Sequence, residues 1–174
     1  MIVIKAERLV LRRLTADDAE NFYLLNLDPE VIRYTGDHSF LNIEEAKHFL
    51  DSYTHYHEYG FGRWAVMDKN SHEFLGWCGL KYSPEKEETD IGFRFFKKHW
   101  GKGYATEAAR ASLEIGFRQY KISEIVGRAM KANSASVSIL EKLGLTFKKK
   151  VDFGGHEGVS YSVKNPLSRK EASS

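Results

Sequence analysis

The sequence contains a single cysteine, Cys78, and only three prolines. One cysteine excludes an intrachain disulfide and is typical of a reducing compartment, so we expect a cytoplasmic protein. No apolar stretch approaches the roughly 18 residues that cross a bilayer. The first residues also lack the basic start, apolar run and cleavage site of a signal peptide. These absences predict neither a membrane-spanning nor an exported chain.

An excess of charge of one sign is also missing. The chain has 26 Lys and Arg against 24 Asp and Glu, which gives a net charge of +2. Nucleic-acid-binding proteins usually gather their basic residues in one patch, so we expect no direct binding to nucleic acid or to a membrane. One basic run, Lys148-Lys149-Lys150, falls in an expected edge strand, where lysines hinder aggregation.

The composition is that of a globular protein, with 42% hydrophobic and 13% aromatic residues in a chain of 174. This length is enough to bury a sizeable core. We predict one domain over residues 1–165 and a flexible tail over residues 166–174.

The first sixty residues carry three helix-start signals after a short strand at about 7–13. Each signal is a capping side chain followed by a proline or an acidic residue: Thr15 with Asp18, Asp28 with Pro29, and Asn42 with Glu45. Apolar residues at helical spacing continue the third helix to an expected stop at Gly60.

The hydrophobic period then changes to alternation. This pattern predicts strands at 63–67, 74–81 and 89–96, a helix at 105–120, a strand at 122–129, a helix at 134–143, and two strands joined through Gly154-Gly155. The expected fold class is α+β, with a mostly antiparallel sheet and helices packed on it.

Gly101 and Gly103 stand between an expected strand and an expected helix. Without side chains there, backbone N–H groups can approach a ligand closely, and the helix start adds partial positive charge. Phosphate suits such a site, and Lys102 would add a charge. A tight turn without a ligand is an equally open interpretation, because neither a P-loop nor a full dinucleotide fingerprint is present.

The wider sequence around this loop resembles a known family. Residues 90–93 (DIGF), 100–108 (WGKGYATEA) and 133–144 (NSASVSILEKLG) resemble the acetyl-CoA motifs of the GNAT N-acetyltransferase superfamily. Residues 7–12 (ERLVLR), 28–31 (DPEV) and 74–80 (FLGWCGL) resemble its branch of ribosomal-protein alanine acetyltransferases. The resemblance implies a mixed, mostly antiparallel sheet with a V-shaped splay, flanked by helices, and acetyl-CoA as the acetyl donor.

The resemblance also implies contacts to the donor. The strand before the glycine loop would carry a bulge and splay from its neighbour, so that backbone groups of Phe93, Arg94 and Phe95 pair with the pantetheine arm. A backbone N–H there would polarise the thioester carbonyl. The pyrophosphate would be held by the amides of Gly101, Lys102, Gly103, Tyr104, Ala105 and Thr106. Asn133 would bind the pantetheine amides, a role compatible with helix capping.

The implied chemistry is attack of a neutral amine on a thioester, which needs a proton acceptor and a donor to the departing thiolate. Many relatives use a tyrosine seven residues after the motif asparagine, but Leu140 stands there in this chain. Ser136 becomes the candidate acid and Asp90 the candidate base, whereas Glu107 is expected to be structural. A local hydrogen bond at the helix start and an ordinary strand-end charge are the respective alternatives for Ser136 and Asp90.

Two other chemistries find little support in the sequence. Cys78 lies in an apolar strand without a neighbouring His–Asp pair, which indicates a packed thiol rather than a nucleophile. The seven histidines form no His-Glu-x-x-His or His-x-x-x-His arrangement, so we expect no metal.

The sequence therefore predicts an enzyme that transfers acetyl from acetyl-CoA to a primary amine, with the N-terminal α-amine of a ribosomal or other protein as the favoured acceptor. A small-molecule acceptor (a polyamine, amino sugar or antibiotic) and a non-catalytic acyl-CoA-binding module remain alternatives. A homodimer is also left open.

Overall fold

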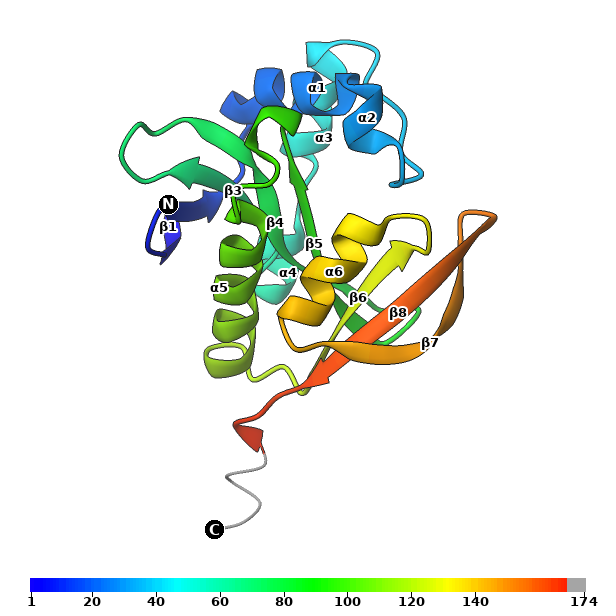
Figure 1. Ribbon diagram of the computed structural model, residues 1–174. Helices are drawn as coiled ribbons and strands as arrows, with labels where there is room; N and C mark the ends of the chain where they lie inside the picture. Colours follow the sequence, from blue (N-terminus) through cyan, green and yellow to red (C-terminus); the bar gives the residue numbers. More distant parts are fainter. Residues whose placement is uncertain (169–174) are drawn as a thin grey trace.

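The computed structural model describes residues 1–168, in which eight strands form one open mixed sheet (Figure 1). The strands are β1 (Ile2–Lys5), β2 (Leu9–Arg13), β3 (Arg63–Asp68), β4 (Phe74–Ser83), β5 (Glu88–Phe95), β6 (Glu124–Met130), β7 (Thr146–Phe153) and β8 (His156–Lys164). Their order is β1-β2-β3-β4-β5-β6-β8-β7, and only the β5–β6 pair is parallel. The predicted mostly antiparallel α+β class is confirmed.

Helices cover both faces of this sheet. They are α1 (Ala19–Leu27), α2 (Pro29–Ile32), α3 (Ile43–Asp51), α4 (His55–Tyr59), α5 (Tyr104–Arg118) and α6 (Ser134–Lys142). In β3, Val66 packs in the cluster that contains α5 residues such as Leu113, whereas Ala65 packs in the cluster of α1 and α3. Neighbouring strand residues point to opposite faces, so α5 lies on one face and the α1–α3 layer on the other.

The predicted helix starts form, with one change in detail. The Thr15 capping box and the Asp28 cap are present. At the third start, Asn42 Oδ1 accepts from Glu45 N at 2.8 Å, but Glu45 Oε2 accepts from Leu41 N at 2.6 Å instead of from the cap residue. The Glu45 carboxylate therefore accepts from the N–H of the residue before the cap, whereas in a capping box it would accept from the N–H of the cap residue itself.

The single helix predicted from Asn42 to Gly60 is wrong, because α3 and α4 are separate helices. Tyr53 lies between them, and its hydroxyl accepts from Arg63 N at 2.8 Å. Gly60 ends α4 in a left-handed conformation, as its φ of 82° shows. The sequence pattern missed the break because no glycine or proline marks residues 52–54.

The sheet also contains a strand that was not predicted, β1, which precedes the expected first strand. Near the end of the chain, Asn165 Nδ2 donates to the carbonyls of Phe117 at 3.1 Å and Ile122 at 3.0 Å. Residues 166 and 167 form a turn, and residues 169–174 of the predicted tail lie outside the described residues. Over residues 1–168, no helix is long and apolar enough to span a membrane.

Candidate active site

Strands β5 and β6 pair only near their beginnings. The parallel register contains Thr89 opposite Ile125 and Asp90 opposite Val126, and beyond these pairs the strands separate. Figure 1 shows the divergence, with α6 beside it. The predicted V-shaped splay is therefore present.

One wall of the splay is the backbone of β5. Phe96 N donates to Leu75 O at 3.1 Å, and the register of β5 with β4 is unbroken along its length, so the predicted bulge is absent from this pairing. Alternate residues of an antiparallel strand bond to the same neighbour. The backbone of Arg94 therefore faces β4, whereas Phe93 and Phe95 direct theirs into the splay. The pairing of pantetheine with Phe93, Arg94 and Phe95 stays a prediction, and of these three residues Phe93 and Phe95 have backbone groups that face the splay.

The opposite wall is the backbone of β6. Lys131 N donates to Glu157 O of the β8 side at 2.9 Å. By the same alternation, Arg128 and Met130 direct their backbone groups toward the splay. Met130 O already accepts from Asn133 N at 2.9 Å, which ties the start of α6 to this wall.

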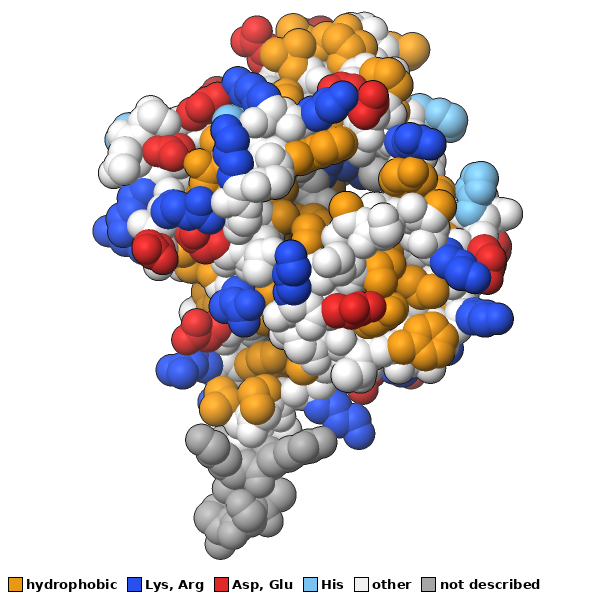
Figure 2. Space-filling view, viewed as in Figure 1, with side chains coloured by type: hydrophobic (Ala, Val, Ile, Leu, Met, Phe, Trp, Pro, Cys, Tyr) orange, Lys and Arg blue, Asp and Glu red, His pale blue; other side chains and the backbone are white. Residues whose placement is uncertain are grey.

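The glycine loop follows β5 at the open end of the splay. Because β5 and β6 are parallel, the starts of α5 and α6 lie at the same edge of the sheet. Trp100 Nε1 donates to Phe95 O at 2.9 Å and fixes the loop to the strand. Gly101 and Gly103 have φ values of 75° and 79°, a region that favours glycine. Figure 2 shows the surface hollowed between the α1–α3 layer and α6, with lysines and arginines nearby.

The first turn of α5 offers backbone donors at this open end. Gly103 precedes the helix without a side-chain cap, and Glu107 N makes the first helical bond, to Gly103 O at 3.0 Å. The N–H groups of Tyr104, Ala105 and Thr106 precede that bond and have no intrahelical acceptor. This arrangement suits an anion such as a phosphate.

Arg8 holds the glycine loop from β2's side of the sheet. Its Nη1 donates to Lys102 O at 2.9 Å, its Nε pairs with Glu107 Oε1 at 2.7 Å, and its guanidinium lies 4.5 Å from the Tyr104 ring centroid. The hydrogen bond to Glu107 raises the pKa of Arg8 above its ordinary value. Glu107 was expected to be structural, and its carboxylate pairs with Arg8. Sequence reasoning missed Arg8 because no spacing rule links residues 99 positions apart.

At the start of α6, Asn133 acts as the helix cap, and its Oδ1 accepts from Ser136 N at 3.3 Å. Ser136 is half-buried in the first turn of this helix. Leu140, at the position where many relatives carry tyrosine, is 2% exposed and packs so closely on Gly127 that a Cβ there would collide with it. The roles predicted for Asn133 toward pantetheine and for Ser136 toward sulfur stay predictions.

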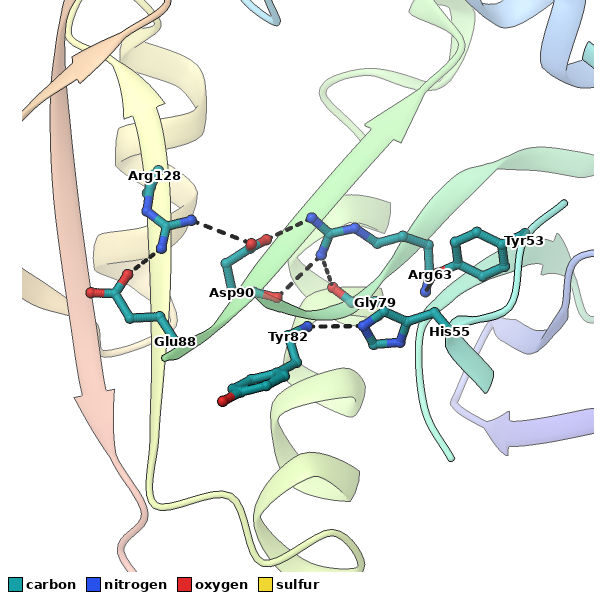
Figure 3. Close-up of polar contacts among 8 residues, drawn as sticks. All are labelled: Tyr53, His55, Arg63, Gly79, Tyr82, Glu88, Asp90 and Arg128. Carbon is teal, nitrogen blue, oxygen red and sulfur yellow. Dashed lines mark hydrogen bonds and ion pairs between the residues drawn. The ribbon is translucent and has the colours of Figure 1, made fainter. Parts of the chain in front are cut away.

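Asp90 lies at the last β5–β6 pair, in an ion cluster that joins three strands (Figure 3). Its Oδ1 accepts from Arg63 Nη2 at 2.6 Å, its Oδ2 lies 3.4 Å from Arg128 Nη1, and Arg128 also pairs with Glu88. The Asp90 side chain is only 12% exposed. Both carboxylate oxygens thus face guanidinium groups. The role of Asp90 as a base stays a prediction. The alternative, that Asp90 is a structural charge, is supported by its ion pairs with Arg63 and Arg128.

The side chain of Arg63 extends in this cluster from β3 to the backbones of β4 and β5. Its Nη1 donates to Gly79 O at 2.7 Å and to Asp90 O at 3.1 Å. A Cβ at Gly92 would lie 2.7 Å from Arg63 Cζ, so this position must lack a side chain for the guanidinium to fit. The glycine of the DIGF segment therefore makes room for Arg63.

Arg94 connects β5 with the α1–α3 layer. Its Nη1 donates to Asn26 Oδ1 at 2.8 Å and its Nη2 pairs with Asp37 Oδ2 at 2.6 Å. Its guanidinium carbon lies 5.2 Å from the Trp77 ring centroid, and that of Arg63 lies 5.4 Å from the same ring. Trp77 is therefore in contact with two arginines.

Cys78 is fully buried, with its Sγ 3.6 Å from Ser112 Oγ, and burial raises the pKa of its thiol to about 12. The predicted packed thiol is confirmed. Within the described residues, no group of three or more His, Cys, Asp or Glu side chains is placed to hold a metal ion.

Comparison with known proteins identifies the family. Residues 8–146 match the acetyltransferase (GNAT) domain. The Bacillus subtilis (strain 168) protein YkkB is 34% identical over 139 residues, which cover 78% of this chain and 79% of that protein. The Bacillus licheniformis protein p20, named an uncharacterized N-acetyltransferase, is 28% identical over 145 residues, which cover 82% of this chain and 82% of that protein. The chain belongs to the GNAT family and is an N-acetyltransferase.

Solved structures share the fold. A GNAT-family acetyltransferase from Bacillus anthracis has a TM-score of 0.81 and 25% identity, and the match covers 95% of this chain and 99% of that one. A ribosomal-protein-S5-alanine acetyltransferase from Vibrio fischeri has a TM-score of 0.78, 19% identity and coverage of 95% and 97%. A Vibrio cholerae spermidine N-acetyltransferase, in complex with CoA and spermine, has a TM-score of 0.77, 18% identity and coverage of 91% and 96%.

Proposed function

We propose that this chain transfers the acetyl group of acetyl-CoA to the α-amine of a peptide or protein. The splay between β5 and β6 is the observation that carries the proposal, because backbone of β5 that no longer pairs with β6 and free helix amides meet at its open end. An extended pantetheine arm with two amides can pair with the backbone of Phe93 and Phe95 as an added strand would. Its pyrophosphate then suits the amides of residues 101–106.

The proposed acceptor approaches from the face opposite α5. Ile91 and Phe95 point into the core cluster that contains α5, which closes that face. Asp90, Gly92 and Arg94 alternate with them and point to the other face. An amine arriving there meets the strand on which the thioester would lie.

The proposed reaction is direct transfer. The amine nitrogen forms a bond to the thioester carbonyl carbon, the carbon–sulfur bond breaks, and the proton lost by nitrogen passes to solvent or to a base. A backbone N–H of β5 is proposed to stabilise the carbonyl oxygen as negative charge develops. Ser136 is proposed to donate to the departing sulfur, a mild demand because thiols have a pKa near ~8.5.

The α-amine is preferred on chemical grounds. Its pKa is near ~7.7–8.0, whereas that of a lysine side chain is near ~10.4, so lysine costs roughly 3–4 kcal/mol more to deprotonate at neutral pH. Asp90 faces two guanidinium groups and is poorly placed to serve as a free base. The fold itself does not choose the acceptor, since acetyltransferases named for a ribosomal protein and for spermidine both share it.

Gly103 provides the test of the donor site. A Cβ at Gly103 would meet only Arg8 Nη2, at 3.4 Å, and its φ of 79° is one that Asn and Asp tolerate better than other side chains. Gly103→Asp and Gly103→Asn therefore carry a similar strain and differ mainly in charge. We expect calorimetry to show at least about tenfold weaker acetyl-CoA binding for the Asp variant than for the Asn variant, because a carboxylate would repel the pyrophosphate. Equal affinities would refute the phosphate-loop assignment.

A further inference from the structure

The sheet face proposed for acceptor entry has its carboxylates paired with arginines. Asp90 pairs with Arg63 at 2.6 Å and lies 3.4 Å from Arg128, and Arg128 also holds Glu88. Beside this cluster, the charge of Asp37 is paired with that of Arg94 at 2.6 Å. An incoming ammonium group would have to compete with a guanidinium for each of these carboxylates.

Two lysines on the same sheet face add positive charge beside the cluster. Lys81 is directly opposite Asp90 in the β4–β5 register, and Lys149 is opposite Ser160, which is itself opposite Arg128. Residues directly opposite in neighbouring strands share a face. Both lysines are exposed. Glu124, on the same face of β6 as Arg128, is paired with Lys148 at 2.5 Å. Around the cluster the cations thus outnumber the carboxylates: Arg63, Lys81, Arg94, Arg128, Lys148 and Lys149 against Asp37, Glu88, Asp90 and Glu124.

One arginine also retains a buried donor. The Nε–H of Arg94 is buried without a hydrogen-bond acceptor among residues 1–168, and its side chain is 10% exposed. A buried donor without an acceptor is costly, so such groups are usually satisfied. An oxygen of a bound ligand would remove this cost beside Trp77.

We propose that the acceptor carries an anionic group close to its reactive amine, and that the site rejects polycationic amines. This inference rests on the proposed function and on entry of the acceptor at this face. The surplus of guanidinium and ammonium groups attracts an oxyanion and repels further positive charge. For a peptide acceptor, the preferred N-terminus has acidic residues directly after the first residue.

Release of CoASH is measured with three acceptors at low salt. The first two are peptides that begin Ser-Glu-Glu or Ser-Arg-Arg and are otherwise identical without lysine, and the third is spermidine. We expect kcat/KM to be about tenfold higher for the acidic peptide than for the basic peptide or spermidine, with a smaller difference at high ionic strength. Equal rates, or faster turnover of either cationic acceptor, would overturn the inference.

Reversing the charge of one of these lysines tests whether this sheet face determines the preference for an acidic acceptor. Lys81→Glu is expected to reduce the preference for the acidic peptide by about three- to fivefold. Lys5→Glu makes the same change on the edge strand β1, three places from β4 in the sheet order, and should leave the preference unchanged. Similar behaviour of the two variants would refute the inference while transfer itself stands. Failure of the wild-type enzyme to turn over any of the three acceptors would count against the proposed function as well.

Discussion

Two candidate catalytic side chains, Asp90 and Ser136, stand in different surroundings. Asp90 is 12% exposed and faces Arg63 and Arg128, whereas Ser136 is half-buried in the first turn of α6. Removing Asp90 would leave two partly buried guanidinium groups without their partner, so loss of stability would obscure any catalytic effect. Ser136 is therefore the better residue on which to test catalysis.

Ser136→Ala should lower kcat more than it weakens acetyl-CoA binding. The reason is that a donor to the departing sulfur acts mainly in the transition state. We expect a fall in kcat of about tenfold or more, the lower range of general acid catalysis, with donor Kd changed by less than about twofold. Steady-state kinetics and calorimetry measure the two quantities. A change confined to KM would identify Ser136 as a binding or capping residue instead.

His99 predicts a dependence of stability on pH. It is 8% exposed just before the glycine loop, and burial lowers its pKa, with Lys98 and Lys102 adding to this and Glu73 opposing it. The unfolded chain therefore takes up the proton more readily. Stability contributed by neutral His99 is present above the unfolded pKa of about 6.5 and is lost as pH falls through the folded pKa.

We expect the free energy of unfolding to fall between about pH 7.5 and about pH 5.5, and His99→Asn to make that fall shallower by at most about 1.4 kcal/mol per pH unit. Denaturant titrations of both proteins across this range measure the difference. Parallel pH profiles would show that His99 is not the group responsible.

At the scale of single elements, what could be predicted depended on how local the determinant is. The 3₁₀ helix Ala16–Asp18 that leads into α1, and the start of α2, follow from side chains within three residues, and Thr15 and Asp28 make the expected bonds. The break between α3 and α4 depends on Tyr53 reaching Arg63, a contact ten residues away in the chain. The anchor between Arg8 and Glu107 joins residues far apart in sequence, so periodicity carries no sign of it. The splay itself was expected only from the family resemblance.

The segment between α2 and α3 is expected to affect the acceptor rather than the donor. Arg94 holds Asp37 of this segment and Asn26 of α1, while its neighbours Phe93 and Phe95 present their backbones to the splay. Arg94→Gln should lower kcat/KM for the acceptor by about tenfold, the loss expected when a partly buried pair is broken. Donor Kd should change by less than about twofold.

Lys97→Gln is the matched control for this prediction. Lys97 pairs with Glu30 of α2 at 3.2 Å, so it also connects the region after β5 with the helical layer. Both side chains are more than half exposed, at 53% and 57%, and such pairs contribute little. We expect near wild-type kinetics for Lys97→Gln, and an equal loss in both variants would argue against a specific role for Arg94.

At the scale of the whole molecule, the sheet consists of two parts that meet at β5 and β6. The part formed by β1 to β5 carries the glycine loop, and the part formed by β6, β8 and β7 carries α6. They are joined by two register pairs and by the ion cluster around Asp90. This arrangement places the two helix starts on either side of the proposed donor site, and the acceptor is proposed to enter on the face opposite α5, beside the α1–α3 layer.

Competition between two amines tests the central claim most directly. One peptide has a free N-terminal serine and no lysine, and the other has the same sequence with a blocked N-terminus and one internal lysine. With acetyl-CoA at neutral pH, we expect mass spectrometry to show acetylation of the free α-amine peptide well before that of the blocked peptide, with CoASH released in equal amount to product. Equal rates on the two peptides, or acetylation of the lysine first, would contradict the proposed α-amine specificity.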